Sequence, residues 1–224
     1  MYNAYGVIWE INDPIKLHGE RRRAEVTASL LQPHSSDVIL DVGCGDGYQV
    51  SYVISQAAWY SPIDTSTYKL KKGKRRIKEA NFICASSEKL PFQPQAFNKV
   101  MCLELLEHLK DPSKTMNEID LVLKRGGVLI VSVPYKERIY MTRCIHCGKL
   151  TPLYGHLHSP STWRPRAPSA RASPLLQCAY IYATLSAYIL FSALPTRFWK
   201  IVDSLSRFLP GIKPSWFINK VQKI

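Results

Sequence analysis

The chain has 224 residues, which is enough for one full domain with an elaborated end and too few for two large domains. Hydrophobic residues make up 46% of it, aromatic residues 11% and charged residues 21%, which excludes disordered, collagen-like and disulfide-stapled proteins. The formal net charge is +13, and such an excess of positive charge is typical of proteins with an anionic partner.

The first elements predicted along the chain are a helix over residues 15–31 and a strand over residues 38–42. The strand stops at a glycine, and apolar residues recur at helical spacing after Gly47. A second strand is expected to end at Asp64, although Pro62 within it lacks the N–H that a central strand uses. The order is therefore strand, glycine turn, helix, strand.

Strands and helices continue to alternate toward residue 134. Residues 69–78 hold seven basic residues, which predict a solvated helix face, with a nucleic-acid site as the alternative. Further strands are expected over residues 82–85, 100–103 and 128–133. Asp111 followed by Pro112 predicts the start of a helix that Lys124, Arg125 and Gly126 close. Because these strands are apolar on both faces, they predict an α/β fold with a parallel sheet covered by helices.

The last third of the chain differs in charge and pattern. Residues 1–134 carry 17 basic and 15 acidic residues, a net of +2, whereas residues 135–224 carry 13 and 2, a net of +11. Prolines punctuate residues 159–173, which we expect to be loop or disordered. The uncharged residues 175–194 favour a strand over a membrane span. Residues 198–209 predict an amphipathic helix with a basic face.

The most informative stretch is Asp41-Val42-Gly43-Cys44-Gly45-Asp46-Gly47, which lies between the first strand and the following helix. A ligand can meet backbone N–H groups at such a place, on the carboxyl edge of a sheet. Glycines permit positive φ in the turn and a close approach of the backbone to that ligand. Their G-x-G-x-G spacing differs from the G-x-G-x-x-G of dinucleotide-binding proteins.

Several further features follow the glycine turn in chain order: Asp64, Leu90-Pro91-Phe92, Phe97, Leu103-Glu104-Leu105-Leu106-Glu107-His108-Leu109 and Leu123-Lys124-Arg125-Gly126-Gly127. Together with the glycine turn, they resemble the class I S-adenosylmethionine-dependent methyltransferases, in particular the broad group that includes quinone-biosynthesis enzymes. The resemblance implies a Rossmann-like methyltransferase sheet, mostly parallel, with helices on both faces and S-adenosylmethionine as cofactor.

The resemblance also implies a set of cofactor-binding residues. They are Asp41, Gly43, Cys44, Gly45, Gly47, Asp64, Ser86, Ser87 and Leu103. Asp64 is expected to accept hydrogen bonds from both ribose hydroxyls, and its alternative role is to cap the following helix. Two positions depart from the family pattern: Ser86 stands where relatives carry an acidic residue for the adenine, and Asn98 replaces an aspartate.

The candidate catalytic residue is His108, which follows the fourth strand and could remove a proton from the methyl acceptor. In some quinone O-methyltransferases the positions of Glu104 and Glu107 bind a divalent metal. The alternative is that Glu107 and His108 only shape the cofactor pocket or bind backbone.

A second set of side chains combines Cys144 and Cys147 with His156 and His158, in the pattern C-x₂-C followed by H-x-H. Four such ligands suffice for tetrahedral zinc, so a structural zinc site is one interpretation. The others are histidines at the mouth of the acceptor site and an ordinary loop.

Together these features predict a methyltransferase of three parts. Residues 1–134 form the S-adenosylmethionine-binding core, residues 135–173 an insert over the acceptor side, and residues 174–224 a strand and amphipathic helix that complete or cap the domain. The expected partner is a small or lipid-like acceptor, with peripheral membrane contact through the basic tail. The cysteine usage and the start of the chain favour a reducing cytoplasm. The alternative function is a degenerate methyltransferase fold that binds nucleic acid or membrane through its basic surfaces.

Overall fold

The computed structural model describes residues 14–49, 59–135, 138–157, 177–181 and 216–223. Three predicted segments lie outside the described residues: the helix after Gly47, the proline-rich stretch 159–173 and the amphipathic helix 198–209. None of the described helices is both long enough and apolar enough to cross a membrane.

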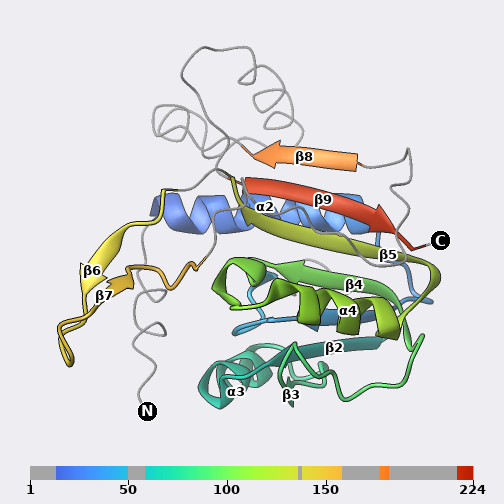
Figure 1. Cartoon of the computed structure of the whole chain (residues 1–224). Coiled ribbons are helices and arrows are strands. Elements are labelled where there is room, and N and C mark those ends of the chain that lie inside the picture. Colours follow the sequence, from blue (N-terminus) through green and yellow to red (C-terminus); the bar gives the residue numbers. More distant parts are fainter. Residues whose placement is uncertain (1–13, 50–58, 136–137, 158–176, 182–215, 224) are drawn as a thin grey trace.

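A seven-stranded sheet forms the centre of the molecule (Figure 1). Its strands are β1 (Val38–Val42), β2 (Trp59–Asp64), β3 (Ile83–Cys84), β4 (Phe97–Leu103), β5 (Leu123–Pro134), β8 (Gln177–Ile181) and β9 (Trp216–Gln222), in the order β3-β2-β1-β4-β5-β9-β8. Strands β1 to β5 pair in parallel, whereas β9 is antiparallel to both β5 and β8. The predicted Rossmann-like, mostly parallel sheet is confirmed.

The described helices are α2 (Pro14–Leu31), α3 (Thr67–Arg76), the short 3₁₀ helix η3 (Leu106–His108) and α4 (Pro112–Val122). Ser66 caps α3 by accepting from the N–H of Lys69, and Asp111 caps α4 by accepting from the N–H of Ser113. Helix α4 ends at Val122, and β5 already begins at Leu123, where the sequence predicted that the helix continued.

Two hydrophobic layers cover the opposite faces of the sheet. In β1 the side chains alternate, so that Leu40 and Val42 pack into one layer and Ile39 into the other. The first layer contains Met116 and Ile119 of α4, and the second contains residues of α2 and the residue that follows α3. Both layers contain strand side chains that are almost fully buried. The predicted cover of helices on both faces is thus confirmed.

The position of Pro62 in β2 explains how the sheet tolerates it. Ile63 turns its carbonyl toward β1, where it accepts from the N–H groups of Gly43 and Cys44 at 2.9 Å. Because successive residues of a strand point to opposite sides, Pro62 faces β3, and β3 pairs only with Ile63 and Asp64. The N–H that Pro62 lacks is therefore not needed, because the pairing of β2 with β3 begins only at Ile63.

Asn98 lies near the start of β4, at the edge of the sheet opposite the glycine turn. Its side-chain oxygen accepts from the N–H of Val38 at 2.7 Å, and its amide nitrogen donates to Asp37 at 2.5 Å. Asn98 thus ties the beginning of β1 to β4. The departure of Asn98 from the family pattern therefore affects how β1 and β4 are held together, at the edge opposite the glycine turn.

A two-stranded hairpin, β6 (Met141–Arg143) and β7 (Leu150–Pro152), follows β5 and projects away from the sheet (Figure 1). The segment after the hairpin returns to the carboxyl edge of the parallel strands, where the main chain of Leu157 donates to the carbonyl of Glu107 at 2.7 Å. This return places residues 155–157 over η3.

Candidate active site

The glycine turn follows β1 at the carboxyl edge of the parallel strands. Gly43, Gly45 and Gly47 all have positive φ, of 78°, 57° and 70°, as the turn was predicted to require. The turn is closed by a hydrogen bond from the N–H of Gly47 to the carbonyl of Cys44 at 3.0 Å. A side chain at any of the three positions would strain the backbone.

The space around the three glycines differs. A Cβ at Gly43 would lie 3.0 Å from the side chain of Leu105, and one at Gly47 would lie 3.0 Å from the ring of Phe82. At Gly45 the nearest atom is Lys69 Cδ, at 3.9 Å. Gly43 and Gly47 thus pack against the protein, whereas the backbone of Gly45 has room for a ligand beside it.

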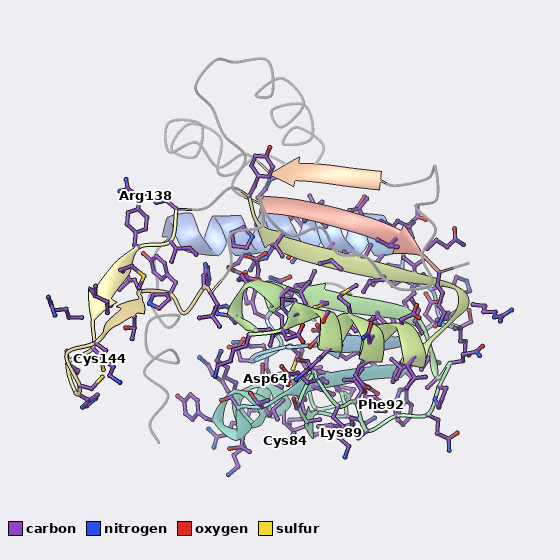
Figure 2. The ribbon with its side chains drawn as sticks, in the orientation of Figure 1. Asp64, Cys84, Lys89, Phe92, Arg138 and Cys144 are labelled. Atoms are coloured by element: carbon purple, nitrogen blue, oxygen red, sulfur yellow. The ribbon has the colours of Figure 1, made fainter. Side chains whose placement is uncertain are left out.

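Asp64 ends β2 and points at the glycine turn. Its Oδ2 accepts from the N–H of Gly45 at 2.9 Å, and its Oδ1 accepts from the N–H of Ser66 at 2.8 Å. Figure 2 labels Asp64 at this edge of the sheet. A carboxylate has about four acceptor positions, so two bonds to the backbone leave it able to accept further hydroxyl groups. Asp64 therefore contacts both the cap of α3 and the turn.

Asp41 is buried one strand away, at the end of β1. Its Oδ2 accepts from the hydroxyl of Tyr60 at 2.6 Å. Burial raises the pKa of the Asp41 carboxyl to about 7; the negative charge of Asp64 also raises it, whereas the Tyr60 hydrogen bond lowers it. Burial also raises the pKa of the Cys44 thiol, so Cys44 stays protonated. A cationic ligand group near Asp41 would favour its charged form.

The remaining predicted cofactor residues lie at the same edge. Ser86 follows β3 and forms a turn in which its hydroxyl accepts from the N–H of Glu88 at 3.2 Å. Ser87 is bonded instead to the hydroxyl of Thr115 in α4, at 2.9 Å. Leu103 is buried at the end of β4. The exposed Ser86 is therefore freer than Ser87 to meet a ligand.

His108 ends η3, and another histidine lies directly beside it. The rings of His108 and His156 make an edge contact with their centroids 4.7 Å apart. His108 Nδ1 lies 3.3 Å from the carbonyl oxygen of Gly155, which can only accept, so Nδ1 carries the proton and Nε2 is the acceptor. Burial and the neighbouring His156 lower the pKa of His108 to about 4. The imidazole is therefore neutral at neutral pH.

Glu107 joins these two histidines. Ligand atoms of Glu107, His108 and His156 all lie within 4.8 Å of one another, so the three could hold a metal ion. Glu104, by contrast, contacts Arg23 of α2 at 3.2 Å and accepts from the hydroxyl of Ser132 at 2.8 Å. Of the two glutamates that the resemblance connected with a metal, only Glu107 lies with His108 in such a group.

The predicted zinc set is not brought together. Within the described ranges, the metal-binding group that contains His156 includes neither Cys144 nor Cys147, and His158 lies outside those ranges. Figure 2 shows Cys144 at the tip of the hairpin, far from the sheet. Sequence reasoning missed the contact between His156 and His108, because no local pattern connects residues that lie 48 positions apart. The predicted zinc site of Cys144, Cys147, His156 and His158 therefore finds no support among the described residues.

Comparison with known families identifies part of the chain. Residues 40–131 match the family described as "Methyltransferase domain". This segment contains the glycine turn, Asp64, β4 and η3.

Among curated relatives, the ubiquinone biosynthesis O-methyltransferase of Xylella fastidiosa (strain 9a5c) is 33% identical to the chain over 105 residues. The match covers 45% of this chain and 43% of the relative. The chain thus matches less than half the length of that enzyme.

Two solved structures resemble the fold over most of the chain. An S-adenosylmethionine-dependent methyltransferase from Mesorhizobium loti has a TM-score of 0.61 and 14% identity, and covers 89% of this chain and 98% of its own. A putative methyltransferase from Haloferax volcanii, solved in complex with the Trm112 methyltransferase activator, has a TM-score of 0.65 and 16% identity over 100% of this chain and 99% of its own. At these identities the comparison establishes the fold.

Proposed function

We propose, from the premise that residues 40–131 form a class I S-adenosylmethionine-dependent methyltransferase domain, that the whole chain methylates an oxygen of a small or lipid-like acceptor. The choice of oxygen is supported by the name of the Xylella fastidiosa relative. Oxygen acceptors of this kind must lose a proton during the transfer, so the site needs a group that takes it.

One observation carries the proposal: the carboxylate of Asp64 is bonded to Gly45, the glycine with room beside it. A nucleoside placed at Gly45 would present its ribose hydroxyls to Asp64. Ser86 lies after the neighbouring strand β3, on the side where the adenine would extend. The methionine part would extend toward Asp41, whose carboxylate favours a cationic amino group.

S-adenosylmethionine, when bound, supplies a methyl group on a positively charged sulfur. The chain's own contribution is to orient the acceptor and to accept its proton. We assign that proton to His108 Nε2, because Nδ1 is committed to the carbonyl of Gly155. His156 packs against the His108 ring and would position it.

The three-part arrangement of the chain is part of the same proposal. Residues 1–134 bind the cofactor, residues 135–173 cover the acceptor side, and residues 174–224 complete the domain. The contacts of residues 155–157 with η3 support a cover at the acceptor side. Strands β8 and β9 support the completing role, since both belong to the sheet.

A degenerate fold that only binds nucleic acid or membrane is not favoured. Three residues of the sequence favour it, namely Ser86, Asn98 and Pro62, and two of them have structural explanations away from the ligand. Pro62 faces β3 at a position before the two strands pair, and Asn98 ties β1 to β4 at the opposite edge of the sheet. The third, Ser86, retains a hydroxyl that can accept a hydrogen bond.

Calorimetric titration with S-adenosylmethionine and its demethylated product tests the proposal. We expect both to bind, and we expect Asp64→Ala to lose about 1.5–3 kcal/mol of binding free energy, which is roughly 10- to 150-fold in Kd. The loss arises because hydrogen bonds from the ribose hydroxyls to a charged group are removed.

Asp46→Asn is the matched control. It removes a carboxylate from the same turn, where Asp46 contacts Lys72 and Arg76 at 3.6 and 3.2 Å. We expect its Kd to stay within about threefold of wild type, since these exposed pairs contribute little. The proposal fails if neither ligand produces binding heat with wild type, or if folded Asp64→Ala binds as tightly as wild type.

A further inference from the structure

The tip of the β6–β7 hairpin is a turn that carries two cysteines, Cys144 and Cys147. Its backbone is fixed by two hydrogen bonds of 2.8 Å, from the N–H of Cys144 to the carbonyl of Lys149 and from the N–H of Gly148 to the carbonyl of Cys144. Gly148 has a φ of 68°, which permits the chain to turn back after Cys147. The hairpin therefore holds both cysteines on one short, closed turn.

The turn also places donors around one of the sulfurs. Cys144 Sγ accepts from the N–H groups of Cys147 and His146 and contacts the thiol of Cys147. Cysteine sulfurs are ligands of soft metal ions, so the turn holds two adjacent sulfurs that can bind one metal ion.

Two sulfurs are half of a tetrahedral site. In the stretches that the structure describes, no further Cys, His, Asp or Glu side chain forms a metal-binding group with this pair. The tip also points away from the sheet, as Figure 2 shows for Cys144. Among the described residues, the tip thus supplies two of the four ligands that a tetrahedral zinc ion takes.

The surface of the hairpin is suited to contact with another protein chain. Ile145, between the two cysteines, is 91% exposed, and the flanking Tyr140, Met141 and Leu150 are 53–61% exposed. The tip also carries Arg143 and Lys149 and no described acidic residue. Two such tips would repel each other unless negative charge lay between them, and a zinc ion with four thiolates has a net charge of −2.

We propose that Cys144 and Cys147 form half of a zinc site that the same two cysteines of a second copy of this chain complete. Four thiols then lose their protons to solvent, and one zinc ion joins two hairpins. Ile145, Met141 and Leu150 of each copy bury apolar surface around the site, and Arg143 and Lys149 neutralise its charge. This site is independent of the methyltransferase reaction and of the histidines at η3.

The test measures metal content and molecular mass together on the full-length chain, purified without a histidine tag and with reductant. We expect about one zinc ion per two chains by mass spectrometry of the metal, and a dimer by light scattering. A chelator should release the zinc and convert the dimer to monomer, and added zinc should restore it. Cys144→Ser and Cys147→Ser should each lose both zinc and dimer.

Cys84→Ser is the matched control, because Cys84 is an exposed free thiol on the edge strand β3, away from the hairpin (Figure 2). It should retain zinc and dimer. Absence of zinc in wild type overturns the proposal. One zinc ion per monomeric chain also overturns it, because the ligands would then come from a single copy, and so does a dimer that persists in Cys144→Ser.

Discussion

The charge of His108 is set mainly by burial, and the segment that returns from the hairpin contacts its ring. His156 and the carbonyl of Gly155 touch its ring, Glu107 lies within ligand distance, and the positive charge of Lys69 also disfavours protonation. Burial has the largest effect and lowers the pKa of His108 to about 4. The ring is neutral in the folded protein, whereas in the unfolded chain it takes up a proton below about pH 6.5.

This difference predicts how stability depends on pH. Between about pH 6.5 and pH 4 the unfolded state binds more protons at His108, so the free energy of unfolding must fall as the pH falls. We expect wild type to lose about 1–3 kcal/mol more than His108→Gln over this range, because the partly exposed ring is screened by solvent. Urea unfolding of both proteins near pH 7 and near pH 4.5 measures it.

Asp41 acts in the opposite direction over nearly the same range. Since its pKa is raised to about 7, the folded protein holds a proton that the unfolded chain releases above about pH 4, and stability falls as the pH rises. Both proteins share Asp41, so their difference isolates His108. A difference that stays constant with pH would contradict the assignment of a neutral, buried imidazole.

Some residues of the candidate site could be predicted from neighbouring residues in the sequence, and others could not. Asp41, the three glycines and Asp64 were predictable because a strand end, a glycine spacing and the next strand end are each read from adjacent residues. The contact of His156 with His108 was not predictable, because the path of the hairpin brings the two residues together. The spacing of Cys144, Cys147 and His156 suggested one site, whereas β7 and the following turn separate them.

At the scale of elements, α3 meets the glycine turn through the ring of Phe82, the residue before β3. A Cβ at Gly73 of α3 would lie 2.5 Å from the ring of Phe82 and 3.0 Å from the carbonyl oxygen of Asp46. Gly73 thus lets the helix approach the turn closely. The other side of α3 is the predicted solvated basic face, on which Lys71, Lys74 and Arg75 are exposed.

This contact predicts that Gly73→Ala destabilises the protein, against the helical preference of alanine. The gain in helix propensity is about 1 kcal/mol, whereas overpacking against Phe82 and the Asp46 carbonyl costs more, so we expect a net loss of about 1–2 kcal/mol. In a Phe82→Leu background the same change should cost less. Urea unfolding of the four proteins measures the coupling, and stabilisation by Gly73→Ala in both backgrounds would contradict it.

Elements with clear chemical boundaries were predicted well from the sequence. The strand before the glycine turn and the start of α4 at Asp111–Pro112 match the structure, because a glycine and a capped proline mark them. The end of α4 was placed too late, since Leu123 continues the apolar spacing of the helix although it belongs to β5. Strand β9 was missed, because its sequence WFINKVQ does not alternate as a half-buried strand should.

At the scale of the whole molecule, the C-terminal strand β9 completes the sheet between β5 and β8. It pairs with β5 from Val128 to Pro134, and Ile218 in its middle is fully buried in the layer that α2 covers. The C-terminal strand therefore contributes to the core through Ile218. The predicted uncharged segment supplies β8, which pairs with β9 from the other side.

We expect Ile218→Ala to lower the free energy of unfolding by about 2–4 kcal/mol, because it removes a buried side chain and leaves a cavity between β9 and α2. Gln222→Ala is the control on the same strand. Its exposed side chain donates one hydrogen bond to the carbonyl of Gly126 at 3.2 Å, so its effect should stay within about 1 kcal/mol. Equal effects of the two changes would show that β9 is not anchored in the core.

The insertion of β9 also has a consequence for the order in which the protein folds. Translation delivers β8 before β9, yet β8 reaches the sheet only through β9. Until residues 216–222 emerge from the ribosome, β5 remains an open edge with unpaired backbone groups, and such edges invite association with other chains. One edge of β5 in the nascent polypeptide therefore stays unpaired while more than 80 further residues are synthesised. The late stages of biosynthesis are thus the period of greatest risk of aggregation.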